Sequence, residues 1–395
     1  MVLKKYDMGL ISVTAMGIGS VVGAGIFALR GEVILQAGNL SYYAFIIAGI
    51  AAMFSGYSYA KLSGKYPDSG GLTDYFKIAF KSRAVSGTFT LIYYITSFVS
   101  ISMLAKSFGI YACKFLHDAA MEPLCVNYFA SGIIIALAIL NMMGADKVGN
   151  AETLMVAFKF FVLLSLIAGA FIELDVRSDK VDFMPTPTAF LGSIGITFFA
   201  YAGYGIITNA AADVKNPKFT IAAAIYLTII IVALLYTSLA YIILKYIPEA
   251  DLTANADTAI TIAAEKLFGK WGYGIMFAAA IIAFISGISA TYFSVFRISY
   301  ALAEQKIMPK IYHKRFWEHG TYGNALSVAV LTLATIYFDF NSIVNLASGA
   351  YLVSYLAVFA ASWVLRRETG ASPVLILLGS ALMVFILVMF LANIY

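Results

Sequence analysis

The sequence predicts an all-α polytopic membrane protein, and its composition and its pattern of apolar runs predict this class. Of 395 residues, 62% are apolar and 12% are charged, whereas soluble domains hold about 45–50% apolar and about 25% charged residues. A soluble fold of this composition would expose apolar patches far above the few hundred Å² that soluble monomers tolerate. The composition therefore excludes a cytosolic enzyme and a peripheral membrane protein.

The apolar residues occur in long runs, each able to cross a bilayer as a helix of about 20 residues. About eleven runs are separated by charged or turn-forming clusters. They are expected at residues 9–29, 40–60, 84–112, 128–144, 154–172, 188–211, 221–244, 273–303, 325–338, 343–365 and 374–394. The third and eighth runs are longer than a bilayer needs and should tilt or project. No small-residue cleavage site follows the basic residues 1–6, so the first run is interpreted as a retained helix.

Lysines and arginines are unevenly distributed between the two sides of these spans. With the N-terminus inside, 17 of them fall inside and 7 outside, and two lie within spans. Because cytoplasmic loops carry the excess of positive charge, we predict a cytoplasmic N-terminus. With eleven spans the C-terminus is then outside, and the chain is a multi-pass protein of the cell membrane.

Several other classes of site are not expected. No run of Lys and Arg is long enough for a nucleic-acid patch. His117, His313 and His319 lie in predicted loops without metal-ligand spacing, so neither a metal nor a cofactor is expected. Cys113 and Cys125 lie near one predicted loop, where two free or buried thiols are favoured over a disulfide. The spans hold no cluster of His, Asp or Glu, so we expect no catalytic residues and no intramembrane enzyme.

The first span has two glycines around one alanine near its middle, Gly23, Ala24 and Gly25. Glycine weakens a helix by ~1 kcal/mol relative to alanine. On the evidence of this segment alone, a break in the helix and close helix packing through small residues are equally favoured. Gly203 occupies the middle of the sixth span, 180 residues after Gly23. Glycine-interrupted helices in corresponding places of two halves are typical of inverted-repeat transporters, so we expect both helices to be unwound at mid-membrane.

The whole chain, residues 1–395, is then one transmembrane domain. One five-span repeat covers about 9–173, the other covers about 188–366, and an extra C-terminal helix covers about 374–394. Unwound backbone in a bilayer is tolerated where it lines a cavity. Its N–H groups suit a carboxylate and its carbonyls suit an ammonium, and an amino acid carries both groups.

Short motifs in this order resemble the amino acid–polyamine–organocation superfamily, whose members have a LeuT-type fold. The motifs are residues 23–27 (GAGIF), 66–71 (YPDSGG), 199–203 (FAYAG), 214–217 (VKNP), 300–304 (YALAE) and 308–309 (MP). Together they cover most of residues 9–370 and resemble prokaryotic proton-coupled amino-acid permeases. Leu72 and Thr73 depart from the pattern, since an aromatic residue is usual there. Eleven spans, where twelve are common, put a dimer contact through a twelfth helix in doubt, so a monomer or weak homo-oligomer is expected.

The resemblance implies where an amino acid would bind. Its carboxylate would meet backbone N–H groups of residues 23–25, and its ammonium would meet carbonyls near Ser20, Val21 and residues 199–202. Phe199 matches the aromatic residue that closes the substrate site on the outer side, with plain core packing as the alternative. The expected substrate-binding residues are Ser20, Val21, Val22, Gly23, Ala24, Gly25, Ile26, Phe199, Ala200, Ala202 and Gly203.

Lys159 lies about five residues inside the fifth span. An ionisable residue within a bilayer is a functional candidate because burying it costs ~2.5–3.5 kcal/mol on insertion scales, and snorkelling is the alternative. The resemblance places a lysine here in proton-coupled members, where its ammonium replaces a sodium ion. It implies, as partners, the Gly19 carbonyl and the hydroxyls of Ser286 and Ser289. Burial would favour release of the proton.

For three further charged residues, Lys106, Arg297 and Glu304, we expect structural roles only. Lys106, near the outer end of the third span, is expected to snorkel to the interface. Arg297 and Glu304 share a face of the eighth span and are expected to form a surface pair near the inner interface.

These observations predict a secondary active transporter that imports an amino acid with protons by alternating access. An exchanger and a sodium-coupled carrier remain alternatives, although Lys159 argues against sodium, and a non-transporting membrane sensor is a remote one. The expected site is lined by small or apolar side chains, and no acidic residue lies at mid-membrane. A neutral or apolar amino acid is therefore the expected substrate, and the lipid bilayer is the other partner.

Overall fold

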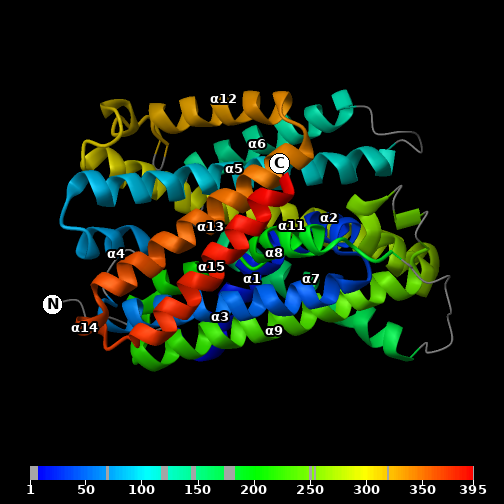
Figure 1. Ribbon diagram of the computed structural model, residues 1–395. Helices are drawn as coiled ribbons and strands as arrows, with labels where there is room; N and C mark the ends of the chain where they lie inside the picture. The colour runs from blue at the N-terminus through cyan, green and yellow to red at the C-terminus, as the bar shows by residue number, and fades with distance from the viewer. Residues whose placement is uncertain are drawn as a thin grey trace.

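The structure, a computed structural model, describes residues 8–67, 71–116, 123–143, 148–172, 183–248, 251–252, 255–317 and 320–394. Long helices run roughly parallel to one another through the bundle, as Figure 1 shows. Helices α6 and α12 lie along one side, α3 and α9 lie along the other, and α13 and α15 cross in front of the bundle.

The helices of the first half are α1 (Leu10–Ala28), α2 (Arg30–Ala37), the 3-10 helix η1 (Gly38–Leu40), α3 (Ser41–Lys65), α4 (Leu72–Ala79), α5 (Arg83–Leu116), α6 (Pro123–Met143) and α7 (Val148–Ile172). Those of the second half are α8 (Pro187–Ala200), η2 (Tyr204–Asp213), α9 (Pro217–Tyr246), η3 (Ala256–Thr258), α11 (Ala259–Glu304), η4 (Lys310–Tyr312), α12 (Tyr322–Tyr337), α13 (Phe340–Val364), α14 (Arg366–Thr369) and α15 (Pro373–Ile394).

Each predicted span coincides with helical structure. In the described part of the chain, 10 helices are long and apolar enough to cross a membrane, and α12 is a shorter apolar helix. The predicted class, an all-α polytopic membrane protein, is therefore confirmed. The third and eighth spans are long, as expected: α5 has 34 residues, and α11 has 46 with a kink at Gly269, where φ is 63°. The division into two repeats stays a prediction.

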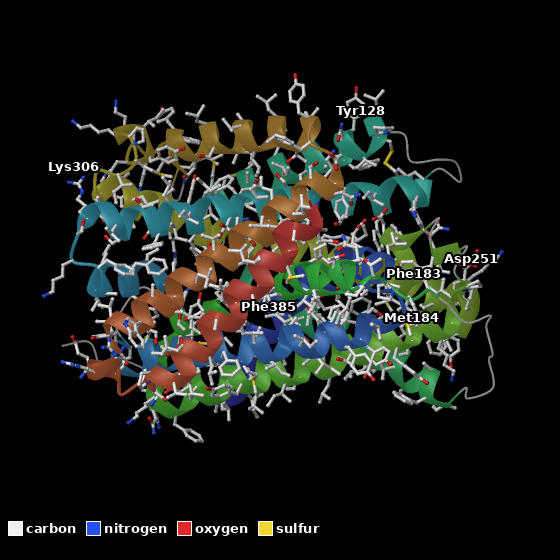
Figure 2. The ribbon with its side chains drawn as sticks, in the orientation of Figure 1. Tyr128, Phe183, Met184, Asp251, Lys306 and Phe385 are labelled. Atoms are coloured by element: carbon white, nitrogen blue, oxygen red, sulfur yellow. A yellow bond between two sulfur atoms is a disulfide. The ribbon has the colours of Figure 1, made fainter. Side chains whose placement is uncertain are left out.

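The side surface and the two ends of the bundle differ in polarity. Tyr128 and Phe385 point outward from the sides, with 76% and 49% of their surface exposed, as expected for residues that face lipid (Figure 2). Lys306 and Asp251 lie at opposite ends of the bundle (Figure 2). Charge at the ends and apolar side chains around the sides fit a protein that spans a bilayer.

The first helix differs from the prediction. α1 is a single helix that continues through Gly23 and Gly25. A Cβ at Gly25 would overlap the carbonyl oxygen of Ala200, and a Cβ at Gly23 would lie 3.4 Å from the Cα of Gly287. The glycines therefore allow close helix packing, which was one of the two interpretations of this segment, the other being a break in the helix.

The sixth span is interrupted. α8 ends at Ala200, and η2 begins at Tyr204 as a 3-10 helix. Gly203 lies between them at φ 121°, which is a conformation that residues with a Cβ rarely adopt. The structure therefore has a break in the sixth span and none in α1, and the unwinding of both helices at mid-membrane stays a prediction.

In Figure 1, α15 begins beside α14 at one end of the bundle and ends near the middle of the view. At the N-terminal end, the Tyr66 hydroxyl donates to Glu368 at 2.6 Å. At the other end, the amide of Asn393 donates to Gln36 at 3.2 Å. The odd number of spans and the side of the membrane on which each terminus lies stay predictions.

Cys113 and Cys125 form a disulfide between α5 and α6. The expectation of two free thiols is therefore wrong. The sequence could not settle the pairing because it did not give the distance between the ends of the two helices; in the structure the two Cα atoms are 6.1 Å apart, which a disulfide can bridge.

Candidate functional site

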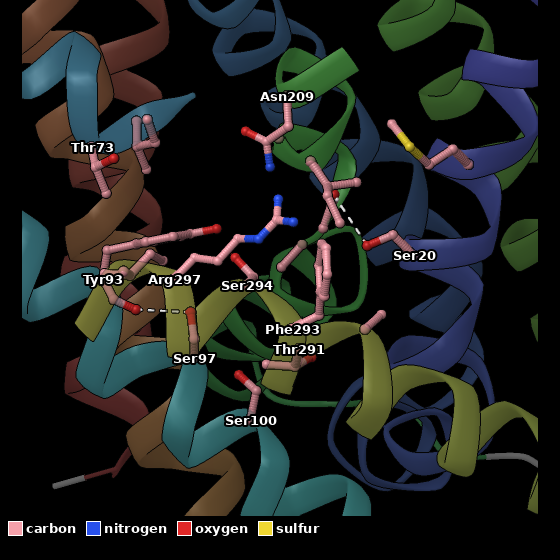
Figure 3. A pocket seen from close by; sticks show the side chains of 18 of the residues that line it. Ser20, Thr73, Tyr93, Ser97, Ser100, Asn209, Thr291, Phe293, Ser294 and Arg297 are labelled. Atoms are coloured by element: carbon pink, nitrogen blue, oxygen red, sulfur yellow. Dashed lines mark hydrogen bonds between the residues drawn. The ribbon is translucent and has the colours of Figure 1, made fainter. Parts of the chain in front are cut away.

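A cavity of about 600 Å³ lies among α1, α4, α5, η2, α11 and α13 (Figure 3). Phe199 and Tyr351 line its deep end, and their ring centroids are 4.9 Å apart. Met8, Asp74 and Lys77 line the part near the N-terminal end of the bundle. The cavity therefore runs from the middle of the helix bundle towards the end where the chain begins.

The two predicted glycine-rich segments meet at the wall of this cavity. The Ser20 hydroxyl, on α1, donates to the carbonyl of Gly203 at 3.3 Å. One turn further along α1, Gly25 packs against the backbone of Ala200. The structure thus brings together the segments that the sequence selected as the two halves of one site.

The expected substrate-binding residues divide into two groups. Those that line the cavity are Ser20, Phe199, Ala202 and Gly203. Those that are buried and outside the lining are Val21, Val22, Gly23, Gly25, Ile26 and Ala200. The side chain of Ala24 lies outside the described part. An unbroken helix uses its interior N–H groups in its own hydrogen bonds, so α1 does not offer the freed N–H groups that an unwound segment would offer.

Tyr236, on α9, was missed by sequence reasoning. Its hydroxyl lies 3.0 Å from the carbonyl oxygen of Val21 and 3.2 Å from that of Ala200, and it can donate to either. The phenol therefore ties α1 to the end of α8 where the helix stops. Its signal in the sequence was weak, because a single tyrosine among 26 has no distinguishing pattern.

One face of α5 supplies hydroxyl groups to the cavity, and this face was also missed. Tyr93, Ser97 and Ser100 line the cavity together with Leu104. Their spacing of three to four residues places them on one side of a helix, so the stripe was readable in the sequence. Figure 3 shows Ser97 and Ser100 following one another along α5.

Lys159, on α7, is fully buried, with 0% of its surface exposed. Its ammonium donates to the Gly19 carbonyl at 2.9 Å and to the Ser286 hydroxyl at 3.4 Å. It therefore joins α7 to α1 and to α11, with both partners as the resemblance implied. Ser289 accepts a hydrogen bond from the Asn141 amide at 3.1 Å. Snorkelling does not describe Lys159, because its ammonium points into the bundle.

Lys106 and Arg297 differ from their predicted roles. Lys106 is 7% exposed, and its ammonium donates to Asn127 at 2.6 Å, so it is held between helices instead of snorkelling. Arg297 lines the cavity, whereas Glu304 lies 3.9 Å from His313. The expected surface pair of Arg297 and Glu304 is wrong, because Arg297 packs on Phe293 one turn back and not towards Glu304.

Comparison with known proteins identifies the family. Residues 8–395 match the family described as Amino acid permease. The chain is 37% identical over 388 residues to the inner membrane transport protein YbaT of Escherichia coli (strain K12), covering 98% of this chain and 90% of that protein. It is 23% identical over 335 residues to the branched-chain amino acid permease BcaP of Bacillus subtilis (strain 168), covering 80% and 71%.

A further relative is the serine/threonine exchanger SteT of Bacillus subtilis (strain 168), 23% identical over 310 residues that cover 77% of this chain and 70% of that protein. The family match spans almost the whole chain, and the all-helical fold of the described residues is consistent with it. The chain belongs to the amino acid permease family, within the amino acid–polyamine–organocation superfamily of membrane transporters.

Proposed function

We propose that the chain imports a neutral amino acid together with protons by alternating access. The observation that carries the proposal is the buried ammonium of Lys159, which bridges α7, α1 and α11 beside the cavity. Burial away from water disfavours the charged form of a lysine, while the Gly19 carbonyl stabilises it. Because burial and the Gly19 carbonyl act in opposite directions on its charged form, this lysine can gain and lose a proton as its surroundings change.

The same ammonium argues against a sodium-coupled carrier. Its partners, the Gly19 carbonyl and the Ser286 hydroxyl, are oxygen ligands of the kind that a hard cation would need. A fixed positive charge already occupies this position. Loss of the proton would remove the charge and weaken the hydrogen bond that ties α7 to α1, so protonation and helix movement would be linked.

The cavity supports a neutral substrate. Its deep part is lined by hydroxyl-bearing and aromatic side chains, and its one lining carboxylate in the described chain, Asp74, forms an ion pair with Lys77 at 2.9 Å. A basic side chain would find no free partner at the deep end. Two relatives carry names that specify branched-chain amino acids and serine or threonine. Both names describe neutral side chains, which is the class that we propose.

The carboxylate of the substrate would bind at the interruption near Gly203, where η2 begins and where Gly205 and Ile206 also line the cavity. Phe199 and Tyr351 would close the site on the far side. Binding to α1 through residues 23–25 would require that helix to open locally. Such opening is the movement expected during turnover.

The structure then represents an inward-facing state, provided that the N-terminus is cytoplasmic. The distribution of Lys and Arg supports this orientation. The disulfide supports it as well, because Cys113 and Cys125 lie at the opposite end from Met8, and disulfides persist in oxidising compartments.

Uptake of a panel of labelled amino acids into proteoliposomes tests the function. We expect a neutral amino acid to accumulate with an inward proton gradient, and no change when sodium is replaced by choline. Uptake only with amino acid preloaded inside would identify an exchanger. Dependence on a sodium gradient would overturn proton coupling. Failure of all panel members, in protein shown to be folded, would overturn amino-acid transport.

A further inference from the structure

Arg297 places a positive charge in the cavity between the deep site and the N-terminal end of the bundle. It lies on the face of α11 that includes Gly287, Ala290, Ser294 and Ala301, all of which line the cavity. Helical side chains lean back towards the start of their helix. Accordingly, its guanidinium carbon lies 3.9 Å from the ring centroid of Phe293, one turn closer to the deep site.

This guanidinium has no carboxylate partner among the residues that the structure describes. Asp74, which lines the same cavity, pairs with Lys77 at 2.9 Å, and Glu304, on the same helix, lies beside His313. Contact with the Phe293 ring holds the guanidinium in place and leaves its N–H groups available. An arginine that lines a cavity and has unused donors is suited to binding an anion.

Asn209, on η2, supplies a second group to the same space. A Cβ at Gly71 would overlap the Asn209 side-chain oxygen, so this oxygen faces the backbone at Gly71. The side-chain nitrogen is then directed into the cavity, and Figure 3 shows the Asn209 and Arg297 side chains pointing into the same region. Amide and guanidinium N–H groups together form a donor set that matches a carboxylate.

We propose that Arg297 and Asn209 form a second carboxylate station, which receives the α-carboxylate of the substrate after it leaves the deep site. Arg297 is ten residues beyond Gly287 in α11, about 15 Å along the helix axis. The side chain reaches part of the way back, so the station lies on the path from the deep site to the end where the cavity opens. The inference rests on the proposed transport of amino acids.

The station acts on one face of the membrane only. Substrate that enters from the far side meets the deep site first, whereas substrate at the N-terminal side meets Arg297 first. The guanidinium therefore raises the affinity for amino acids at the N-terminal face. It also repels substrates with a cationic side chain on the same path.

The test compares the Arg297→Gln and Arg297→Lys variants with wild type in right-side-out and inverted membrane vesicles. We expect Arg297→Gln to raise KM about tenfold at the N-terminal face, as for loss of a charge-assisted hydrogen bond, with little change at the other face. Arg297→Lys should recover part of the affinity, because it keeps the charge without the planar donors. Lys310→Gln is the matched control, since it removes an exposed charge outside the cavity lining and should change neither KM.

Equal KM changes at both faces, or none, would overturn the station while leaving transport intact. Selective loss of transport of acidic amino acids at both faces would also overturn the station, because Arg297 would then bind a side-chain carboxylate in the deep site. If wild type transports no amino acid, the proposed function fails and the station is tested by binding alone.

The binding measurement uses acetate, which is a carboxylate without an ammonium. Acetate should raise the Tm of the detergent-solubilised wild type and of Lys310→Gln, and this shift should disappear in Arg297→Gln. Chloride at equal ionic strength controls for general anion effects. An equal shift with chloride would assign the site to inorganic anions, and an unchanged acetate shift in Arg297→Gln would exclude Arg297 as a carboxylate ligand.

Discussion

At the scale of single residues, Lys159 is the group on which coupling depends. Lys159→Ala removes the charge that joins α7 to Gly19 and Ser286. We expect it to abolish accumulation driven by a proton gradient, and to leave measurable substrate binding because the ammonium lies beside the cavity and not in its lining. Lys159→Arg should fail in the same way, since a guanidinium stays charged at every working pH.

Uptake measured against the pH gradient separates these outcomes. Lys266→Ala serves as the control, because Lys266 is a surface lysine that pairs with Asp251 far from the cavity lining. Full gradient-driven uptake by either Lys159 variant would remove the proton-carrier role and leave a structural lysine.

Tyr236 provides a second prediction at this scale. Tyr236→Phe deletes the hydroxyl that contacts the carbonyls of Val21 and Ala200. We expect a loss of about 1 kcal/mol of stability together with a change in substrate KM, because α1 and α8 would no longer be tied at the site. Tyr246→Phe is matched to it, since Tyr246 is a buried tyrosine on the same helix that donates to Ala170 at 2.8 Å.

Thermal unfolding and transport are measured for both tyrosine variants. Both should lose stability, and only Tyr236→Phe should change KM. Equal KM values in the two variants would make Tyr236 a structural residue only.

The position of a charged residue along its span explains why a functional role was predicted for Lys159 and not for Arg297. A lysine well inside an apolar span is costly, so its position alone indicates a role. Arg297 lies near the end of its span, where arginines commonly reach the interface. Only the structure shows that this end of α11 lines a cavity, together with residues of η2 and α5.

At the scale of elements, the contact of α1 with the end of α8 depends on Gly25. A Cβ there would overlap the Ala200 carbonyl oxygen. Gly25→Ala should therefore destabilise the protein and weaken substrate binding, although alanine favours the helix itself. Gly132→Ala is the matched control: Gly132 is helical, and a Cβ there meets nothing within 4 Å, so the change should be neutral or stabilising.

Thermal unfolding and equilibrium binding of both glycine variants decide this point. If Gly25→Ala is as stable and binds as well as Gly132→Ala, the two helices do not need this close approach.

Asp339 caps the start of α13 and gives a pH-dependent prediction. Hydrogen bonds from the backbone N–H and the hydroxyl of Ser342 hold the pKa of Asp339 below its ordinary value. Because the folded-state pKa is the lower one, this stabilisation is present above the ordinary pKa of an aspartate and is lost as pH falls through the folded-state value. Asp339→Ala should cost about 1 kcal/mol near neutral pH.

Asp339→Asn is the control, since asparagine caps a helix as well and does not titrate. Unfolding measured from neutral to acidic pH should show the difference between wild type and Asp339→Ala shrinking at low pH. A difference that stays constant with pH would mean that the charge of Asp339 adds nothing to the cap.

The two glycine-rich helices show why interruptions are hard to predict. Both spans have glycines at mid-membrane, yet α1 is continuous and the helix that ends at Ala200 is broken. Glycine permits either outcome. Gly203 adopts a positive φ, whereas Gly23 and Gly25 remain helical because neighbouring backbones pack directly against them. That choice depends on tertiary contacts, which no local pattern contains.

At the scale of the whole molecule, the spans were predictable because the runs are long, apolar and bounded by charge. The shape and lining of the cavity were not, because they depend on how α1, α5, η2 and α11 pack. The disulfide between Cys113 and Cys125 was not predictable either, since the separation of two helix ends is a property of the bundle.

Orientation in the membrane gives the last prediction. In a Cys113→Ser, Cys125→Ser background, single cysteines are placed at Asp251, at Lys310 and after Tyr395. Lys310 begins η4, four residues after Lys306, and Figure 2 shows Lys306 and Asp251 at opposite ends of the bundle. With a cytoplasmic N-terminus, an impermeant thiol reagent should label Asp251→Cys and the appended cysteine in intact cells. It should label Lys310→Cys only after the membrane is permeabilised, because the positive charges gather on that side. The reverse pattern would place the cavity on the outer face, and the structure would then be outward-facing, with Arg297 meeting substrate on entry.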